Sequence, residues 1–264
     1  MYAKGLIRRL CFSIHFLSMI FVALLVTSSS AARATSANEN GKKAIDAVND
    51  TVTYDFIVSH LHQAIHILEE NLQHARSLHY SLGEGRTLSQ LGLAYYFLGK
   101  HERSTECYLQ AFEIFETLGE YYELASAYGE FGYQLKRRDI SKALHYMRLA
   151  LALVEQHRLD LGLRSKLYDN YGVLQEMQGK YDSASYFYHR ALAIKQQRRD
   201  LYGIPYSLNK LAGLAALQDR FDEAFSYLRH SDEYRQKEKN NLGRVENYLL
   251  WGDIYTQKGA IDSG

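Results

Sequence analysis

The chain has 264 residues, of which 47% are hydrophobic, and its formal net charge at pH 7 is +1. A charge this close to neutrality excludes the strong positive field with which nucleic-acid-binding domains attract phosphates. Pro205 is the single proline, and so low a proline content over this length favours long helices joined by short connections.

Residues 1–34 have the pattern of a secretory signal peptide. A basic start ends at Arg9, an apolar run extends from Cys11 to Val26, and a segment of small residues ends in Ala32-Arg33-Ala34. This order is typical of a signal with an A-x-A cleavage site. An uncleaved membrane anchor is the alternative, although the apolar run is shorter than the roughly 20 residues that span a bilayer. We therefore expect an exported protein, located in the periplasm or outside the cell.

Removal of residues 1–34 would change both the charge and the cysteine content. No acidic residue leaves with this segment, so 27 basic and 30 acidic side chains remain and the net charge becomes −3. Cys107 would be the one remaining cysteine. An intramolecular disulfide is then impossible, and we expect the exported domain to be held together by packing.

Two segments precede the regular part of the chain. Residues 35–43 are polar and predict a linker. Residues 44–83 carry one helical stripe of apolar side chains and predict a degenerate first repeat or N-terminal cap. The stripe consists of Leu61, Ala64, Ile65, Leu68, Leu72 and Ala75.

From residue 84 onward a small residue returns every forty positions. Gly92, Gly132, Gly172 and Gly252 share this spacing, and Ala212 takes the remaining position. Bulky residues stand one and four positions before each of them, so the small residue would let a neighbouring helix approach closely. A fixed period of this size predicts a repeat array, in which no single unit can bury its apolar face alone.

Each repeat unit is expected to turn and continue in a second helix. Gly179 and Gly259 stand seven positions after two of the periodic glycines, where a left-handed helix C-cap favours glycine. The second helix then repeats small and bulky side chains on one face, as at Ala184, Tyr188 and Ala191. Each unit is therefore predicted to be a helix, a tight turn and a second helix.

These features resemble the tetratricopeptide repeat. Residues 88–95 and 248–255 match its first-helix pattern of a bulky residue, a bulky–glycine pair and a tyrosine, and residues 179–191 match its turn and second helix. The resemblance covers residues 84–264 strongly and residues 44–83 weakly, with a period of forty instead of the usual about 34 residues. It implies an all-α fold, namely a right-handed superhelical solenoid of helix-turn-helix repeats. Counting the cap, we expect four full repeats, followed by a last repeat at residues 244–264 that lacks its second helix and suggests a longer natural protein.

The resemblance also implies a binding face. In this family the concave surface is lined mainly by first helices, and the side chains beside the packing positions point into it. Here they form a mixed groove that is more basic in its middle and suits an extended peptide, or a helix with acidic groups. The candidates are Arg86, Ser89, Gln90 and Tyr96, then Tyr133, Lys136 and Arg137, then Lys166, Asp169 and Asn170, and finally Tyr206, Asn209 and Lys210.

The sequence contains no convincing catalytic or metal-binding set. His101-Glu102 begins like a zinc-protease motif, but Thr105 stands where the second histidine belongs. His62 and His66 have a spacing that metal sites use, yet two histidines on a helix are more often a solvated face. We expect no cofactor, no metal and no enzymatic activity.

Two functions are favoured over a third, an enzyme, and both consist of binding another protein or a peptide. Long-period arrays behind a signal peptide resemble the extracytoplasmic regions of bacterial signalling proteins, so the first hypothesis is a sensor or docking domain of a larger signalling protein. Such a protein would be tethered to the membrane by a segment outside this chain, or by an uncleaved signal. The alternative is a freestanding exported scaffold or assembly chaperone.

Overall fold

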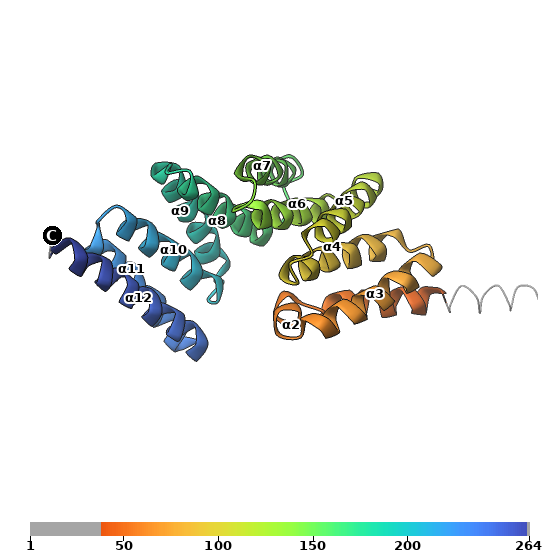
Figure 1. Ribbon diagram of the computed structural model, residues 1–264, viewed down its shortest axis with the longest axis horizontal. Coiled ribbons are helices and arrows are strands. Elements are labelled where there is room, and N and C mark those ends of the chain that lie inside the picture. Colours follow the sequence, from red (N-terminus) through yellow and green to blue (C-terminus); the bar gives the residue numbers. More distant parts are fainter. Residues whose placement is uncertain (1–37, 263–264) are drawn as a thin grey trace, which may run out of the picture. The chain divides into compact units, whose positions relative to one another are not determined.

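The computed structural model describes residues 38–262, and the regular structure in this range is entirely α-helical (Figure 1). A helix over residues 38–51 is followed by α2 (Tyr54–Ser59), α3 (Leu61–Ser77), α4 (Ser81–Phe97), α5 (His101–Leu118), α6 (Tyr121–Leu135), α7 (Ile140–Gln156), α8 (Leu161–Met177), α9 (Tyr181–Arg198), α10 (Gly203–Leu217), α11 (Phe221–Lys237) and α12 (Asn241–Asp262). The predicted signal peptide lies outside these residues. Within them, no helix is long and apolar enough to cross a membrane.

The chain divides into two compact units at Leu98 and Gly99. The described part of unit 1 contains the helix over residues 38–51 together with α2, α3 and α4. Unit 2 contains α5 to α12.

Unit 1 corrects the prediction of a linker over residues 35–43. Residues 38–43 are helical, because they form the first turns of an amphipathic helix that buries Ile45 and Asn49. Gly41 lies so close to Leu78 that a Cβ atom at this position would overlap its side chain. The polar residues of this stretch are therefore the outer face of a packed helix.

The apolar stripe predicted for unit 1 is present on α3. Ala64, Ile65, Leu68 and Ala75 are buried there, and Leu61 and Leu72 are partly buried. The short helix α2, which Thr53 caps by accepting a hydrogen bond from the amide of Phe56, separates helix 38–51 from α3. Residues 44–83 thus contain a helix pair with an inserted third helix.

Unit 2 is built from successive helix pairs, as the repeat pattern predicted. Helices α6 and α7, α8 and α9, and α10 and α11 pack as pairs, and each second helix also packs against the next first helix. We call α6, α8, α10 and α12 the first helices of unit 2, and α5, α7, α9 and α11 its second helices. First helices of neighbouring repeats are also in contact: α6 contacts α8, and α10 contacts α12. The result is an all-α solenoid of helix-turn-helix repeats.

The periodic small residues bring the two helices of a repeat together. A Cβ atom at Gly132 would lie 3.0 Å from the carbonyl oxygen of Ala143 and 3.2 Å from the amide nitrogen of Met147, both on α7. At Gly172 it would overlap the ring of Tyr188 on α9, and Ala212 is fully buried. The sequence pattern therefore identified the helix contacts correctly.

Helix α12 departs from the prediction at its end. The turn expected at residues 259–261 is not formed, since α12 continues to Asp262. In the other repeats a second helix packs against the glycine face, whereas a Cβ atom at Gly252 or Gly259 would meet open space. Within the described residues no helix turns back onto α12, so nothing there imposes the turn.

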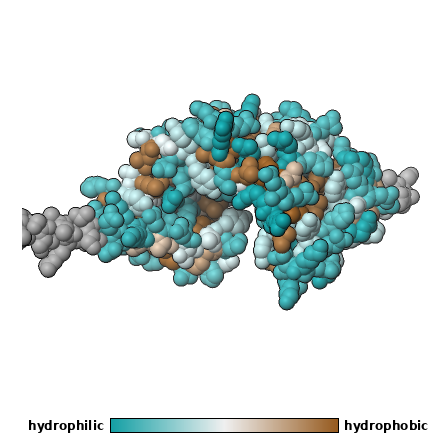
Figure 2. Space-filling view, turned by 180° about the vertical axis from the view of Figure 1, so that it is seen from behind, coloured by the Kyte–Doolittle hydropathy of each residue, from teal (hydrophilic) through white to brown (hydrophobic). Residues whose placement is uncertain are grey.

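Aromatic side chains fill much of the interior of unit 2. The rings of Tyr108 and Phe131 lie 5.3 Å apart, and Phe112 lies 4.5 Å from Tyr128, so α5 and α6 are joined by four rings. The hydroxyl of Tyr108 accepts a hydrogen bond of 2.7 Å from the Gln134 side chain. Buried tyrosines thus place their rings in the core and direct their hydroxyl groups to polar partners. The surface itself is mostly hydrophilic, with smaller hydrophobic patches, on the side that Figure 2 shows.

Two turns of unit 2 offer a matched test of backbone strain. Gly179 and Asp219 occupy equivalent turns with φ angles of 70° and 59°, in the left-handed region that favours glycine. We expect Gly179→Ala to lower the free energy of unfolding by about 1 kcal/mol, and Asp219→Gly to raise it by a similar or smaller amount. Urea unfolding followed by circular dichroism measures both. Equal effects of the same sign in the two variants would show that left-handed backbone strain does not determine the stability of these turns.

Candidate functional site

The predicted binding residues of unit 1 are largely engaged in its own packing. Gln90 donates hydrogen bonds from its side-chain nitrogen to the carbonyl oxygens of Asn49, at 2.6 Å, and Val52, at 3.0 Å. Arg86 forms an ion pair of 3.7 Å with Asp46, and Ser89 is partly buried. The ring of Tyr96 packs against Phe97. These side chains therefore hold the end of helix 38–51 and the surface of α4.

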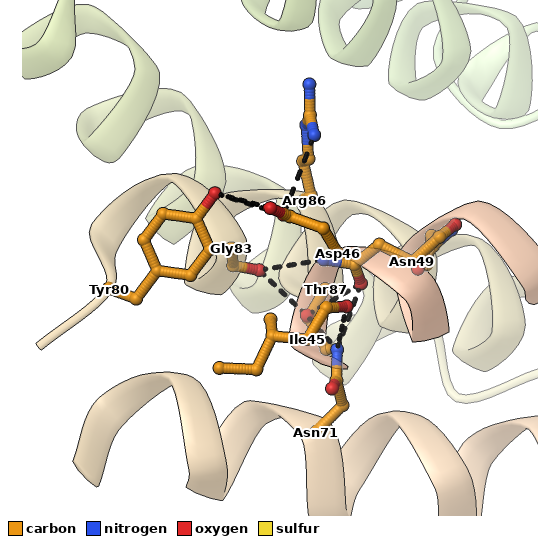
Figure 3. A network of polar contacts seen from close by, with 9 residues as sticks. Ile45, Asp46, Asn49, Asn71, Tyr80, Gly83, Arg86 and Thr87 are labelled. Carbon is orange, nitrogen blue, oxygen red and sulfur yellow. Dashed lines mark hydrogen bonds and ion pairs between the residues drawn. The ribbon is translucent and has the colours of Figure 1, made fainter. Parts of the chain in front are cut away.

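A buried polar network lies next to Arg86 (Figure 3), and Gln90 bonds to the backbone of its member Asn49. Asn49, Asn71 and Thr87 converge from helix 38–51, α3 and α4. The hydroxyl of Thr87 donates to the Asn49 side-chain oxygen at 2.8 Å, and the Asn71 amide nitrogen lies 3.0 Å from that hydroxyl. One side chain from each of these three helices thus closes this junction.

Unit 2 contains two further networks of the same design, which we call junction triads together with the first. In one, Asp169 of α8 forms a buried ion pair with Lys195 of α9 and accepts a hydrogen bond of 3.0 Å from the hydroxyl of Ser207 of α10. In the other, Asn209 of α10 donates to Asn247 of α12 at 2.7 Å, and Asn247 donates to Ser231 of α11 at 3.0 Å.

Asp169 and Asn209 were predicted to point into the groove, and the junction triads correct this. Asp169 is only 5% exposed, because Lys195 and Ser207 hold its carboxylate between three helices. Asn209 is turned toward α12 by its bond to Asn247. Both side chains support the repeat junctions, Asp169 through its whole carboxylate and Asn209 through its amide nitrogen, while the Asn209 side-chain oxygen is buried without a hydrogen-bond partner among the described residues.

The sequence carried a signal for these triads that the glycine pattern obscured. Asn49, Asp169 and Asn209 are separated by multiples of forty residues, and so are Thr87, Ser207 and Asn247. Polar residues that recur at one position of a repeat are candidates for a structural network. The third member of each triad comes from the second helix, and its position depends on packing. Asn71 and Ser231 are separated by a multiple of forty residues, whereas Lys195 stands at a different position of its repeat.

Several other predicted residues of unit 2 do lie on its surface. Lys166 is exposed and pairs with Glu130 of the preceding first helix at 2.8 Å. Asn170, one turn further along α8, is partly exposed, and Tyr206 of α10 is 49% exposed. We call this surface of α6, α8 and α10 the first-helix face. It consists of Tyr133, Lys136, Arg137, Lys166, Asn170, Tyr206 and Lys210.

The basic residues at the end of α6 lie against an aromatic ring. The ammonium group of Lys136 is 3.6 Å from the ring centroid of Tyr133 and 3.4 Å from its carbonyl oxygen. Burial lowers the pKa of Lys136, and the nearby charges of Arg137 and Lys210 lower it further.

The surroundings of Lys210 combine burial with charges of both signs. Burial lowers the pKa of Lys210; the Asp169 carboxylate opposes this shift, whereas the charge of Lys195 adds to it. Glu176 also lies near enough to favour the charged form. This carboxylate accepts a hydrogen bond of 2.8 Å from Tyr188, and burial followed by the charge of Glu176 raises the pKa of that tyrosine.

The described residues contain no group of three or more histidine, cysteine, aspartate or glutamate side chains that could hold a metal ion. His66, from the pair considered in the sequence, lies 3.6 Å from Glu70 on an exposed surface. The first-helix face offers cations, amides and tyrosines, which are groups that bind a partner by contact and charge.

Comparison with known proteins supports the repeat assignment. Residues 60–117 match the family model described as tetratricopeptide repeat. Together with the paired helices of unit 2, this match confirms the prediction of tetratricopeptide-type repeats. A search of curated proteins found no match.

Solved structures with a similar fold include three repeat proteins of low sequence identity. Aspartyl phosphate phosphatase F from Bacillus subtilis is 17% identical with a TM-score of 0.66, over 85% of this chain and 56% of that one. A Rap protein complexed with competence and sporulation factor is 16% identical with a TM-score of 0.67, over 79% and 60%. BtubC from P. vanneervenii is 21% identical with a TM-score of 0.61, over 79% and 90%. The chain thus spans less than two thirds of the first two structures, and the likeness concerns the fold.

Proposed function

We propose that this protein is a non-catalytic scaffold that binds a peptide segment of a partner protein on the first-helix face of unit 2. The observation that carries the proposal is the set of polar and aromatic side chains on this face that remain at least partly exposed. Tyr206 and Asn170 are the clearest members, since one is a 49% exposed ring with the Arg235 guanidinium 5.1 Å from its centroid, and the other is a partly exposed amide. Tetratricopeptide-type folds supply extended surfaces of this kind.

The structural relatives support the same class of partner. One of them, a Rap protein, was solved in complex with competence and sporulation factor, and another is named as an aspartyl phosphate phosphatase. No residue of the present chain is assigned a catalytic role by these likenesses. The polar and aromatic groups of the first-helix face are spread over three helices. A protein or peptide partner therefore fits this face better than a small metabolite does.

Two exposed tyrosines allow a matched test of the binding face. Tyr206 lies on the first helix α10, and Tyr186, which is 57% exposed, lies on the second helix α9. We expect peptides selected from a displayed random library on the full chain to lose about tenfold in affinity with Tyr206→Ala, as expected for an aromatic anchor. Tyr186→Ala should leave their affinity unchanged. If Tyr186→Ala weakens binding and Tyr206→Ala does not, the proposed face is wrong.

We further propose that the protein is exported and acts as the sensor or docking part of a larger signalling protein. The sequence of residues 1–34 supports export, and the array of long-period repeats after it supports the signalling context. The intact mass of the protein purified from its source cells tests both points. A mass below 30.4 kDa by the weight of residues 1–34 supports export of a freestanding scaffold, and a mass well above it supports the larger signalling protein.

A further inference from the structure

We propose that the Arg235 guanidinium, which lies under the Tyr206 ring at the junction of α10, α11 and α12, binds a carboxylate group of the partner peptide. This inference rests on the proposed function and deepens it by naming one anchor of the peptide. The carboxylate belongs to an aspartate or glutamate side chain or to the C-terminus of the peptide. Arg235 is a residue of the second helix α11, so it adds a cation from a second helix to the first-helix face.

Three helices hold the guanidinium of Arg235. Its side chain is only 1% exposed, and Nη1 donates a hydrogen bond of 3.0 Å to the Glu246 carboxylate of α12. The Tyr206 ring of α10 lies over the guanidinium, with 5.1 Å between its centroid and Cζ. A Cβ atom at Gly243 of α12 would overlap the guanidinium, so glycine leaves the room that this side chain occupies. The guanidinium is therefore held in position before a ligand arrives.

One edge of this guanidinium has no partner. Among the described residues, no group accepts a hydrogen bond from Nε or Nη2 of Arg235, although both atoms are buried. These two nitrogens share one edge and direct their N–H bonds in parallel, which is the geometry that binds a carboxylate through two hydrogen bonds. Buried donors without an acceptor are costly, so this edge favours a ligand that accepts from both.

The preceding repeat shows which group this cation lacks. Lys195 stands forty residues before Arg235, and its ammonium group pairs with the buried carboxylate of Asp169. The residue forty positions after Asp169 is Asn209, an uncharged amide whose oxygen has no hydrogen-bond partner in the described part of the chain. Glu246 replaces the missing carboxylate only in part, because it is 51% exposed and contacts one of the three guanidinium nitrogens. The last junction thus has a buried cation without a buried carboxylate.

The surroundings of Arg235 favour a ligand group with a single negative charge. Glu246 already offsets part of the positive charge, so it would repel a dianionic phosphate more strongly than a carboxylate. Tyr206, whose ring covers the guanidinium, is 49% exposed. Rotation of this one side chain would uncover Arg235, and the ring would then pack against the bound peptide. Tyr206 therefore keeps its role as the aromatic anchor.

Fluorescence anisotropy on the full chain tests the inference with library peptides that bind through Tyr206. The library is displayed with free C-termini, and each selected peptide is resynthesised with one carboxylate at a time replaced by its amide. We expect one replacement to weaken binding by about tenfold, since it removes a charge-assisted bidentate contact. Whether this replacement lies in a side chain or at the C-terminus identifies the source of the carboxylate.

Variants of Arg235 complete the double-mutant cycle. Arg235→Lys keeps the charge but not the two parallel donors, so it should bind the unmodified peptide about tenfold more weakly. The same amide replacement should then change the affinity less than about twofold, and Arg235→Met should behave alike. Arg229→Lys is the matched control, because it replaces an exposed guanidinium on the same helix and should leave both affinities unchanged. Circular dichroism confirms that each variant is folded, and the amide replacements test the unaltered protein.

Three outcomes overturn the inference. The first is unchanged affinity after every amide replacement, and the second is an amide effect that persists undiminished in the folded Arg235→Lys variant. The third is displacement of the peptide by inorganic phosphate but not by acetate at equal concentration, which would assign the guanidinium to a phosphate group. In each case, peptides that still depend on Tyr206 leave the proposed function standing. If no peptide binds at all, both fail.

Discussion

Replacing Asp169 by alanine is expected to lower the free energy of unfolding by about 3–5 kcal/mol, because it leaves the buried ammonium group of Lys195 without its counter-charge. The side chains of this pair are only 7% and 8% exposed, so water cannot compensate the loss. Ser207 also loses its acceptor. Urea unfolding followed by circular dichroism measures the effect.

The double variant Asp169→Ala with Lys195→Met is the control for this prediction. It removes both charges and keeps an apolar chain in place of the lysine, so it should recover much of the stability lost in the single variant. In the preceding repeat, the position equivalent to Asp169 is Gly129, and its surroundings are apolar. There the side chains of Leu167 and Ala150 are the nearest to the position of a Cβ atom at Gly129. A single variant as stable as the parent would mean that the pair is not buried in solution.

Replacing Gly132 by alanine is expected to lower the free energy of unfolding by about 1–3 kcal/mol, since the added methyl group meets the backbone of α7. Backbone atoms of Ala143 and Met147 lie 3.0 and 3.2 Å from the position of the new Cβ atom, and backbone cannot swing aside as a side chain can. Helices α6 and α7 would have to separate. Thermal unfolding and urea unfolding both measure the loss.

Gly213→Ala is the matched control for Gly132→Ala. Gly213 also lies inside a first helix, α10, but a Cβ atom there would have no atom within 4 Å. The higher helix propensity of alanine should then raise the free energy of unfolding by about 0.5–1 kcal/mol. Opposite signs in the two variants would establish that helix approach, and not helix propensity, selects glycine at position 132. A loss in both variants would refute this explanation.

The contrast between these two glycines shows where sequence reasoning succeeded. The forty-residue period located Gly132 and Gly172 at the closest contacts of their helix pairs, since a repeat returns the same local packing each time. The same regularity misplaced the turn at residues 259–261, because a turn there needs a second helix to pack back. The linker predicted up to residue 43 failed for a related reason. Its polar residues face outward from a helix whose inner side is fixed by contacts with α3 and α4.

For the candidate site, the sequence placed some residues correctly and misplaced others. The sequence placed Lys136, Asn170, Tyr206 and Lys210 on first helices, and the structure places all four at least partly on the surface. It also nominated Asp169, whose side chain is withdrawn into the interior by Lys195. Hydrophobic periodicity cannot distinguish an outward carboxylate from a buried one, because both are polar positions in the pattern.

The sequence by itself determined the architecture of this protein, because each forty-residue unit repeats the same local alternation of small, bulky and turn residues. Helix pairing follows from such short-range patterns and needs no knowledge of the rest of the chain. Only the tertiary structure decided which charges are satisfied. Asp169 meets Lys195 of the next helix and Ser207 of the following first helix, whereas Lys166 pairs with Glu130 of the preceding repeat. These contacts depend on how neighbouring helices pack in three dimensions, which the local sequence pattern does not specify.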